Sequence, residues 1–122
     1  PHICRAALES IAYQVTDLVG AMTSEAGIRL KELRVDGGPT RNRFLMQFQS
    51  DLLGVPVVRS EAEDASAFGA FVMSGFARGK WNTFAEASSV RSCDAPVLPS
   101  SGAMAARHAY SGWRDAVKEL IG

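Results

Sequence analysis

The sequence has little of several features that would narrow its function at once. It contains only two cysteines, Cys4 and Cys93, whose spacing fits neither a metal site nor a disulfide framework, so we expect two reduced thiols in a cytosolic protein. Thirteen basic and thirteen acidic side chains cancel, which removes the electrostatic reason to expect nucleic acid or an anionic membrane as partner. No apolar run approaches the ~20 residues of a membrane-spanning helix. These absences predict a cytoplasmic protein that binds neither nucleic acid nor membrane.

What is present suffices for one modest domain, since 47% of the 122 residues are hydrophobic. The start at Pro1, without methionine and directly before a helical pattern, suggests a piece of a longer protein. Apolar residues recur at helical spacing over the first 22 positions, and Gly27 is the expected stop. The stripe consists of Ile3, Ala7, Ile11, Val15, Leu18 and Met22, with Leu8, Ala12 and Val19 beside it.

The next segments predict a strand, a helix and a second strand. The strands are expected at residues 30–35 and 55–58, and Pro56 argues for a strand start or an edge position. Between them an amphipathic helix is expected to follow the glycine turn at Gly37 and to end at Leu53, before Gly54. A helix of ~20 Å can carry the chain back past a short strand. We therefore predict a parallel, right-handed βαβ unit and an α/β fold.

The remaining sequence predicts three further helical segments. Asp64 resembles an N-cap, and the helix after it, which ends at Gly79, is so rich in small residues that we expect it to be largely buried. Thr83 is expected to cap a short turn through Ala87. Residues 88–102 are expected to form a loop, and residues 105–120 a last helix.

The turn between the first strand and its helix is the strongest candidate site, and it reads Val35-Asp-Gly-Gly-Pro-Thr-Arg-Asn42. Glycines allow a ligand to approach the backbone, and a helix start directs free N–H groups and a positive dipole end towards it. Pro39 suits the first helical turn, where its missing N–H would have had no partner. Asn42 is expected in that first turn, with its side chain on the same side as the glycines.

Three interpretations of this turn stay open on the local sequence. It can be a structural turn without a ligand, with Asn42 as a capping or solvent-facing amide. A dinucleotide site is disfavoured, because Pro39 and Asn42 stand where the Gly-x-Gly-x-x-Gly pattern needs glycine. A mononucleotide site would place the backbone of Gly37 and Gly38 against the nucleotide and use the amide of Asn42. A P-loop at Gly75–Trp81 is discarded because its glycine spacing is wrong.

The other chemistry-bearing residues do not form a recognisable catalytic set. Arg41 and Arg43 are expected to lie in water, and Asp36 is a poor phosphate ligand because two anions repel each other. His2 and His108 have no spacing that suggests a metal site or a triad. The sequence therefore offers a ligand-binding wall but no general base and no metal ligands.

Three stretches of the chain together resemble the C-terminal end of FGGY-family carbohydrate kinases. They are residues 2–14, residues 35–58 with the glycine turn, and residues 67–81, and residues 111–117 add a weaker match. The resemblance is strongest to the glycerol kinases. It departs at Cys4 and Lys80, where a small residue and an aromatic are expected, and residues 88–102 follow no pattern of the family.

The resemblance implies that residues 1–122 are the C-terminal part of the second, nucleotide-binding domain of a kinase with an actin-like (ribonuclease H-like) fold. Such a kinase uses ATP and Mg²⁺, forms ADP, and phosphorylates a hydroxyl of a polyol or sugar that is bound through the missing N-terminal part. Gly38 and Asn42 match residues of the family that contact the nucleotide, and Gly37 shapes the same turn. No catalytic or metal-binding residue is implied within the segment, which is expected to be inactive alone.

Two alternatives accompany this interpretation. The chain could be a non-catalytic binding or assembly module with the same subdomain fold, or the parent could phosphorylate another sugar such as xylulose. The oligomeric state, a homo-oligomer included, is left open.

Overall fold

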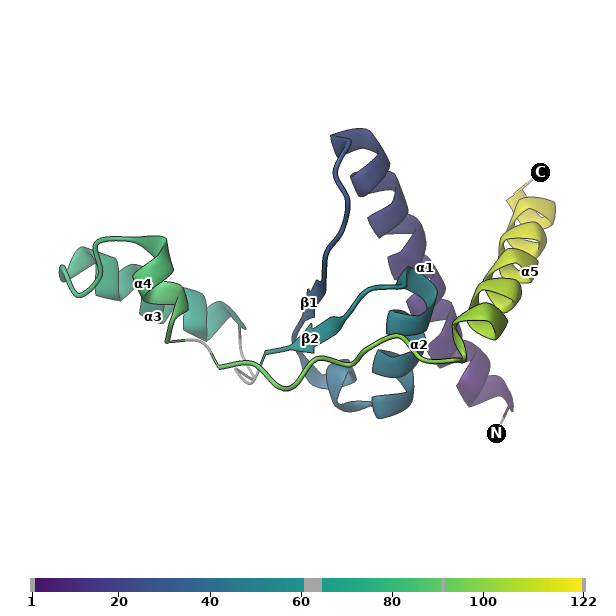
Figure 1. The fold of residues 1–122 in the computed structure, drawn as a ribbon, viewed down its shortest axis with the longest axis horizontal. Coiled ribbons are helices and arrows are strands. Elements are labelled where there is room, and N and C mark those ends of the chain that lie inside the picture. Colours follow the sequence, from purple (N-terminus) through teal and green to yellow (C-terminus); the bar gives the residue numbers. More distant parts are fainter. Residues whose placement is uncertain (1, 61–64, 91, 122) are drawn as a thin grey trace.

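A computed structural model describes residues 2–60, 65–90 and 92–121. In the ribbon view, helices α1, α2 and α5 lie to the right of two short strands, and α3 and α4 stand apart on the left (Figure 1). The predicted N-cap Asp64 lies outside the described residues. The elements are α1 (His2–Ala26), β1 (Leu33–Val35), the 3₁₀ helix η1 (Gly38–Arg41), α2 (Arg43–Leu53), β2 (Val57–Arg59), α3 (Ala65–Ala77), α4 (Phe84–Ser88) and α5 (Ala103–Ile121).

The first helix confirms the predicted length but corrects the predicted inner face. It ends before Gly27, whose φ of 63° is in the left-handed region that favours glycine. Of the predicted stripe, Ile11, Leu18 and Met22 are exposed. The buried residues are Ala12, which was expected beside the stripe, and Tyr13, which was not part of the predicted face. The helical period was therefore correct, but the packed face is rotated away from the most apolar stripe.

The two strands pair in parallel, as predicted, with Leu33 opposite Val57 and Val35 opposite Arg59. Both are shorter than expected, at three residues each. Pro56 lies directly before β2, and its carbonyl accepts a hydrogen bond from the Leu33 N–H at 2.9 Å. The proline thus marks the strand start, where its missing N–H removes no ladder bond.

An extended segment at residues 93–97, which we call the outer segment, lies beside β2 and corrects the expectation of a plain loop. Val57 and Val97 form an antiparallel bridge, as do Ser60 and Cys93. The Val57 N–H donates to the Val97 carbonyl at 2.9 Å, and the Val97 N–H donates back at 2.8 Å. Both cysteines are free and exposed.

The core lies where α2 meets α1 and α5. The Tyr13 ring of α1 packs against Phe48 of α2 at 5.6 Å and against Trp113 of α5 at 5.3 Å between ring centres. This arrangement confirms the predicted last helix as a packed element. The buried apolar cluster consists of Ala12, Tyr13, Leu45, Met46, Leu52, Val57 and Ala106.

A buried carboxylate ties α2 to the start of α5. Asp51 is 6% exposed, and its oxygens accept hydrogen bonds from the Ser100 N–H at 2.6 Å and the Ser100 hydroxyl at 2.9 Å. The side-chain amide of Gln47 donates to Asp51 at 3.1 Å and to the Leu98 carbonyl at 2.9 Å. Because a buried polar group needs such partners, Asp51 specifies the path of the chain into α5.

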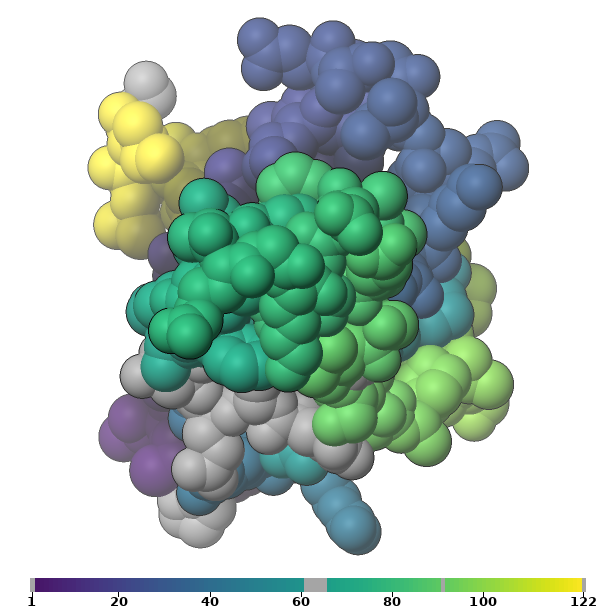
Figure 2. Space-filling view, turned by 90° about the vertical axis from the view of Figure 1, so that its left-hand side faces the viewer, coloured from purple at the N-terminus to yellow at the C-terminus, as the bar shows by residue number. Residues whose placement is uncertain are grey.

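Helix α3 contradicts the expectation of a largely buried helix. Phe71 is 45% and Met73 is 63% exposed, because α3 and α4 form a separate lobe that fills the foreground when the molecule is viewed from that side (Figure 2). The close approach expected of a small residue does occur at Gly75, where a Cβ would lie 1.9 Å from the Trp81 ring. As predicted, α3 is followed by Gly79, whose φ is 68°.

The short helix α4 confirms its predicted cap. The Thr83 side chain accepts a hydrogen bond from the Glu86 N–H at 3.2 Å. Among the described helices, none is long and apolar enough to cross a membrane.

Candidate functional site

The glycine turn begins in a backbone conformation that only glycine adopts easily. Gly37 has φ 89° and ψ 170°. The following residues form η1 through tight bonds, in which the Thr40 N–H donates to the Gly37 carbonyl and the Asn42 N–H to the Pro39 carbonyl, each at 3.1 Å. The Thr40 hydroxyl donates to the same Gly37 carbonyl at 2.6 Å. The turn is therefore held in one shape by its own backbone and by Thr40.

Gly38 differs from Gly37 because its φ is not positive. A Cβ added at Gly38 would meet no atom of the described residues within 4 Å. Neither its conformation nor the packing in this part of the chain therefore requires a glycine there. The free space over Gly38 fits the close approach of a ligand to the backbone.

Asn42 lies one residue before α2, and not within its first turn as predicted. Its φ of −78° and ψ of 106° are extended, and it caps α2 because its side-chain oxygen accepts from the Leu45 N–H at 3.1 Å. The difference arises because η1 takes up the residues from Gly38 to Arg41, so that the α-helix begins only at Arg43. The cap uses the side-chain oxygen and leaves the side-chain nitrogen of this half-buried amide outside the bond.

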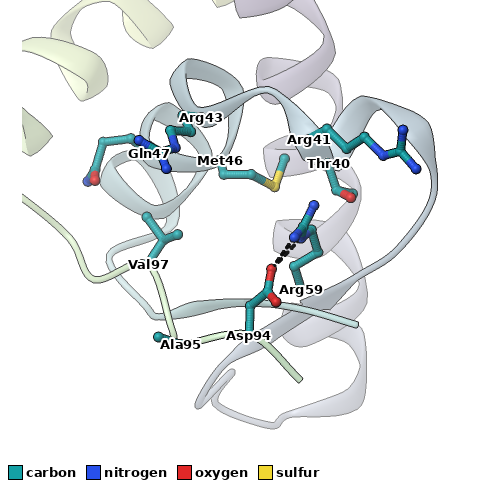
Figure 3. Close-up of a pocket in the computed structure, with 9 residues that line it drawn as sticks. All are labelled: Thr40, Arg41, Arg43, Met46, Gln47, Arg59, Asp94, Ala95 and Val97. Carbon is teal, nitrogen blue, oxygen red and sulfur yellow. Dashed lines mark hydrogen bonds and ion pairs between the residues drawn. The ribbon is translucent and has the colours of Figure 1, made fainter. Parts of the chain in front are cut away.

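A hollow of about 340 Å³ lies beside η1, and its lining includes neither Gly38 nor Asn42. Thr40 reaches it from η1, and Arg43 and Met46 reach it from the start of α2. Arg59 and Asp94 reach it from the end of β2 and from the outer segment (Figure 3). The Arg59 guanidinium forms an ion pair with the Asp94 carboxylate. Arg41 and Arg43 are exposed, as predicted, and both line this hollow. It is completed by Gln47, Ala95 and Val97.

Sequence reasoning did not find this hollow. Arg43, Arg59 and Asp94 come from three segments, and Asp94 lies in a stretch that was expected to be a loop without a site. The outer segment contains Pro96, which argues against strand pairing. No local signal in the sequence therefore connects Asp94 with Arg59.

Lys80 of the discarded P-loop pattern does not belong to the glycine turn. Lys80 lies over the rings of Phe71 and Trp81, at 5.7 Å and 5.3 Å from their centres, in the α3–α4 lobe. Within residues 2–60, 65–90 and 92–121, no three His, Cys, Asp or Glu side chains come together in a way that could hold a metal ion.

The family model described as FGGY family of carbohydrate kinases, C-terminal domain, matches residues 1–78 of the chain. The chain therefore belongs to the FGGY family of carbohydrate kinases. Within that family it is most like the glycerol kinases.

The similarity to glycerol kinases extends over nearly the whole chain. The glycerol kinase of Symbiobacterium thermophilum is 48% identical over 121 residues, which are 99% of this chain and 24% of the relative. The glycerol kinase of Xylella fastidiosa is 43% identical over 121 residues, which are again 99% of this chain and 24% of the relative. The chain thus spans about a quarter of the length of the curated relatives that it matches.

Solved structures show the same fold. Plasmodium falciparum glycerol kinase with ADP matches 97% of this chain and 24% of its own, with a TM-score of 0.82 and 34% identity. A xylulose kinase from Lactobacillus acidophilus matches 99% of this chain and 24% of its own with a TM-score of 0.84, but at 16% identity it shows the fold alone. These matches confirm the prediction of an α/β fragment of an actin-like ATPase domain.

Proposed function

We propose that the chain is the nucleotide-side segment of a cytoplasmic, ATP-dependent kinase that transfers the γ-phosphate of ATP to a hydroxyl of glycerol or a related polyol or sugar. The 48% identity to a glycerol kinase supports this acceptor class. The ADP named for the P. falciparum structure supports a nucleotide ligand. The observation that carries the proposal is the turn at Gly37, Gly38 and Asn42, which lies inside the matched residues 1–78.

In this proposal the turn forms one wall of the adenosine site. The open face over Gly38 accepts the nucleotide at backbone distance, because no Cβ stands there. The side-chain nitrogen of Asn42 donates to the nucleotide while its oxygen keeps capping α2. The two functions of Asn42 reinforce each other, because the cap fixes the direction of the donor.

Phosphoryl transfer depends mainly on the positioning of the reactants and on the stabilisation of charge. Mg²⁺ would neutralise the developing charge on the phosphates, but the described residues do not form a site for it. The part of this segment is therefore to bind and orient the nucleotide. We expect the base, the metal ligands and the acceptor site in the part of the full-length enzyme that lies outside this segment.

An activity assay tests the proposal at the level of the whole enzyme. The full-length protein should form ADP with glycerol or with a member of a polyol and sugar panel that includes xylulose and gluconate. The absence of phosphorylation of every acceptor would refute the kinase and favour a binding or assembly module. The 122-residue chain alone is expected to show no turnover.

Within the same protein, Gly38→Asp should weaken ATP binding by at least about tenfold, or ~1.4 kcal/mol. The substitution places bulk and a negative charge where the nucleotide is expected. The control is Gly112→Asp on α5, a helical glycine that also has no atom within 4 Å of an added Cβ. Equal ATP affinity in both variants would show that the turn is structural only.

Variants of Asn42 separate the cap from the contact with the ligand. Asn42→Ser keeps a good N-cap and loses the amide nitrogen, so ATP affinity should fall about three- to tenfold while thermal stability is kept. Asn42→Ala loses both the cap and the donor and should lower both quantities. If Asn42→Ser binds ATP as well as the wild type, Asn42 serves only as a cap.

A further inference from the structure

The hollow between the start of α2 and the outer segment has the size of a small-molecule site. Its volume of about 340 Å³ lies at the lower end of the roughly 300–1,000 Å³ that ligand pockets occupy. It opens beside the ends of β1 and β2, where Ser60 donates its N–H to the Val35 carbonyl at 2.9 Å. Ligands of open α/β sheets bind at this end of parallel strands.

Arg59 brings unused donor capacity into this hollow. Its ion pair with Asp94 uses Nε and Nη2. A guanidinium carries five N–H donors, so three remain after these two bonds. The Arg59 side chain is 36% exposed and can therefore be reached by a ligand. Figure 3 shows its guanidinium between Asp94 and Thr40.

Arg43 supplies a positive charge that no carboxylate of the described residues balances. Its side chain is exposed, and it lies next to Gln47 on the opposite wall from Arg59 (Figure 3). Arg41 also lines the hollow, but it already interacts with another residue and is left out of the charge balance. With Asp94 balancing Arg59, the hollow keeps one formal positive charge.

Apolar surface accompanies this charge. Met46, which is 8% exposed, points its side chain into the space between the two arginines (Figure 3). Val97 closes the side of the outer segment. An inorganic anion would leave this surface in contact with water, whereas an organic anion would cover it.

We propose that this hollow binds a small organic phosphate ester. The phosphate would accept hydrogen bonds from the guanidiniums of Arg43 and Arg59, which suit phosphate oxygens. The carbon skeleton would lie on Met46 and Val97. The lining of this hollow includes neither Gly38 nor Asn42, and the proposal does not depend on the proposed kinase activity.

Phenyl phosphate is a suitable probe, with inorganic phosphate as the comparison. Binding is measured by calorimetry on the full-length protein in excess ADP, so that phosphate-binding groups of a nucleotide site are occupied. The wild type should bind phenyl phosphate more tightly than inorganic phosphate. Arg43→Gln and Arg59→Gln should each weaken the binding of phenyl phosphate about three- to tenfold, as expected for partly exposed charge pairs.

The control is Arg78→Gln, which removes an exposed arginine after α3 and should leave the affinity unchanged. Arg43 makes no side-chain bond with the described residues, so Arg43→Gln stays informative even where Arg59→Gln disturbs the outer segment. The proposal is overturned if the wild type does not bind the probe at millimolar concentrations, or if it binds the probe only when ADP is left out. It is also overturned if Arg43→Gln binds like the wild type or if Arg78→Gln is weakened equally.

Discussion

Helix α3 is more apolar than α2, but it is α2 that packs its apolar side chains into the core. Helix α3 contains no charged residue, whereas α2 contains Arg43 and Asp51. In spite of this, Leu45 of α2 is 3% exposed and Met73 of α3 is 63% exposed. Apolar composition alone therefore does not determine burial within this chain.

The difference follows from the pattern of each helix and from its neighbours. Helix α2 is amphipathic, so one face can pack against α1 and α5. Its polar residues Gln49, Ser50 and Asp51 are buried as well, and each has a hydrogen-bond partner. A helix that is apolar all around, such as α3, is suited to be surrounded on all sides. Within the described residues, aromatic side chains of α3 pack against Trp81 and Phe84. The chain matches 24% of a relative's length. About three quarters of such a protein are therefore available to cover a helix of this kind.

The largest expected effect tests this comparison directly. Leu45→Ala should lower the free energy of unfolding of the 122-residue chain by about 2–4 kcal/mol, because it leaves a cavity in the core. Met73→Ala should cost less than ~1 kcal/mol, because the side chain is already in water. Urea unfolding followed by circular dichroism measures both. Equal costs would show that α3 is packed in solution.

The same pair of variants in the full-length protein sharpens the comparison. If the rest of the protein covers α3, Met73→Ala should become several times more costly there than in the 122-residue chain, while the cost of Leu45→Ala should change little. An unchanged cost of Met73→Ala would instead mean that this face of α3 is exposed in the complete protein.

A smaller effect is expected at the one place where α3 is tightly packed. Gly75→Ala would put a Cβ 1.9 Å from the Trp81 ring, which must then move, at a cost of about 1–3 kcal/mol. Gly69→Ala in the same helix meets no atom within 4 Å and should stabilise α3 by about 0.5–1 kcal/mol. Hydrogen exchange of residues 65–77 measures both changes. Faster exchange in Gly69→Ala than in Gly75→Ala would contradict this assignment.

Local signals in the sequence predicted the parts of the fold that local interactions determine. Gly54 ends α2 with φ 69° and an N–H bonded to the Ser50 carbonyl, a cap that needs only neighbouring residues. Thr83 and Gly27 were predictable for the same reason. The strand bounds were less accurate, because pairing between β1 and β2 depends on residues that are far apart in sequence.

The candidate site divides in the same way. Gly37 could be predicted because a turn before a helix often requires a positive φ. The exact place of Asn42 could not, because the bonds of η1 compete with an α-helical start at Pro39. The hollow with Arg43, Arg59 and Asp94 depends on the bridges of the outer segment to β2, which no local pattern announces.

The smallest expected effect lies in the core and leaves the α3–α4 lobe untouched, because both tyrosines of the chain belong to the core. Burial, and then the hydrogen bond that its hydroxyl donates to Asp17, raises the pKa of Tyr110. Burial, and then the charge of Glu9, raises the pKa of Tyr13. A raised pKa in the folded state contributes stability that is complete below the unfolded pKa of about 10 and is lost as the pH rises through the folded value. Above about pH 10, exchange should therefore accelerate in α5 more than in α3, and Tyr110→Phe should reduce this difference. If tyrosinate absorbance titrates alike in the folded and the urea-unfolded chain, the tyrosine pKa is not raised by folding. The core would then not disfavour the ionised ring relative to water.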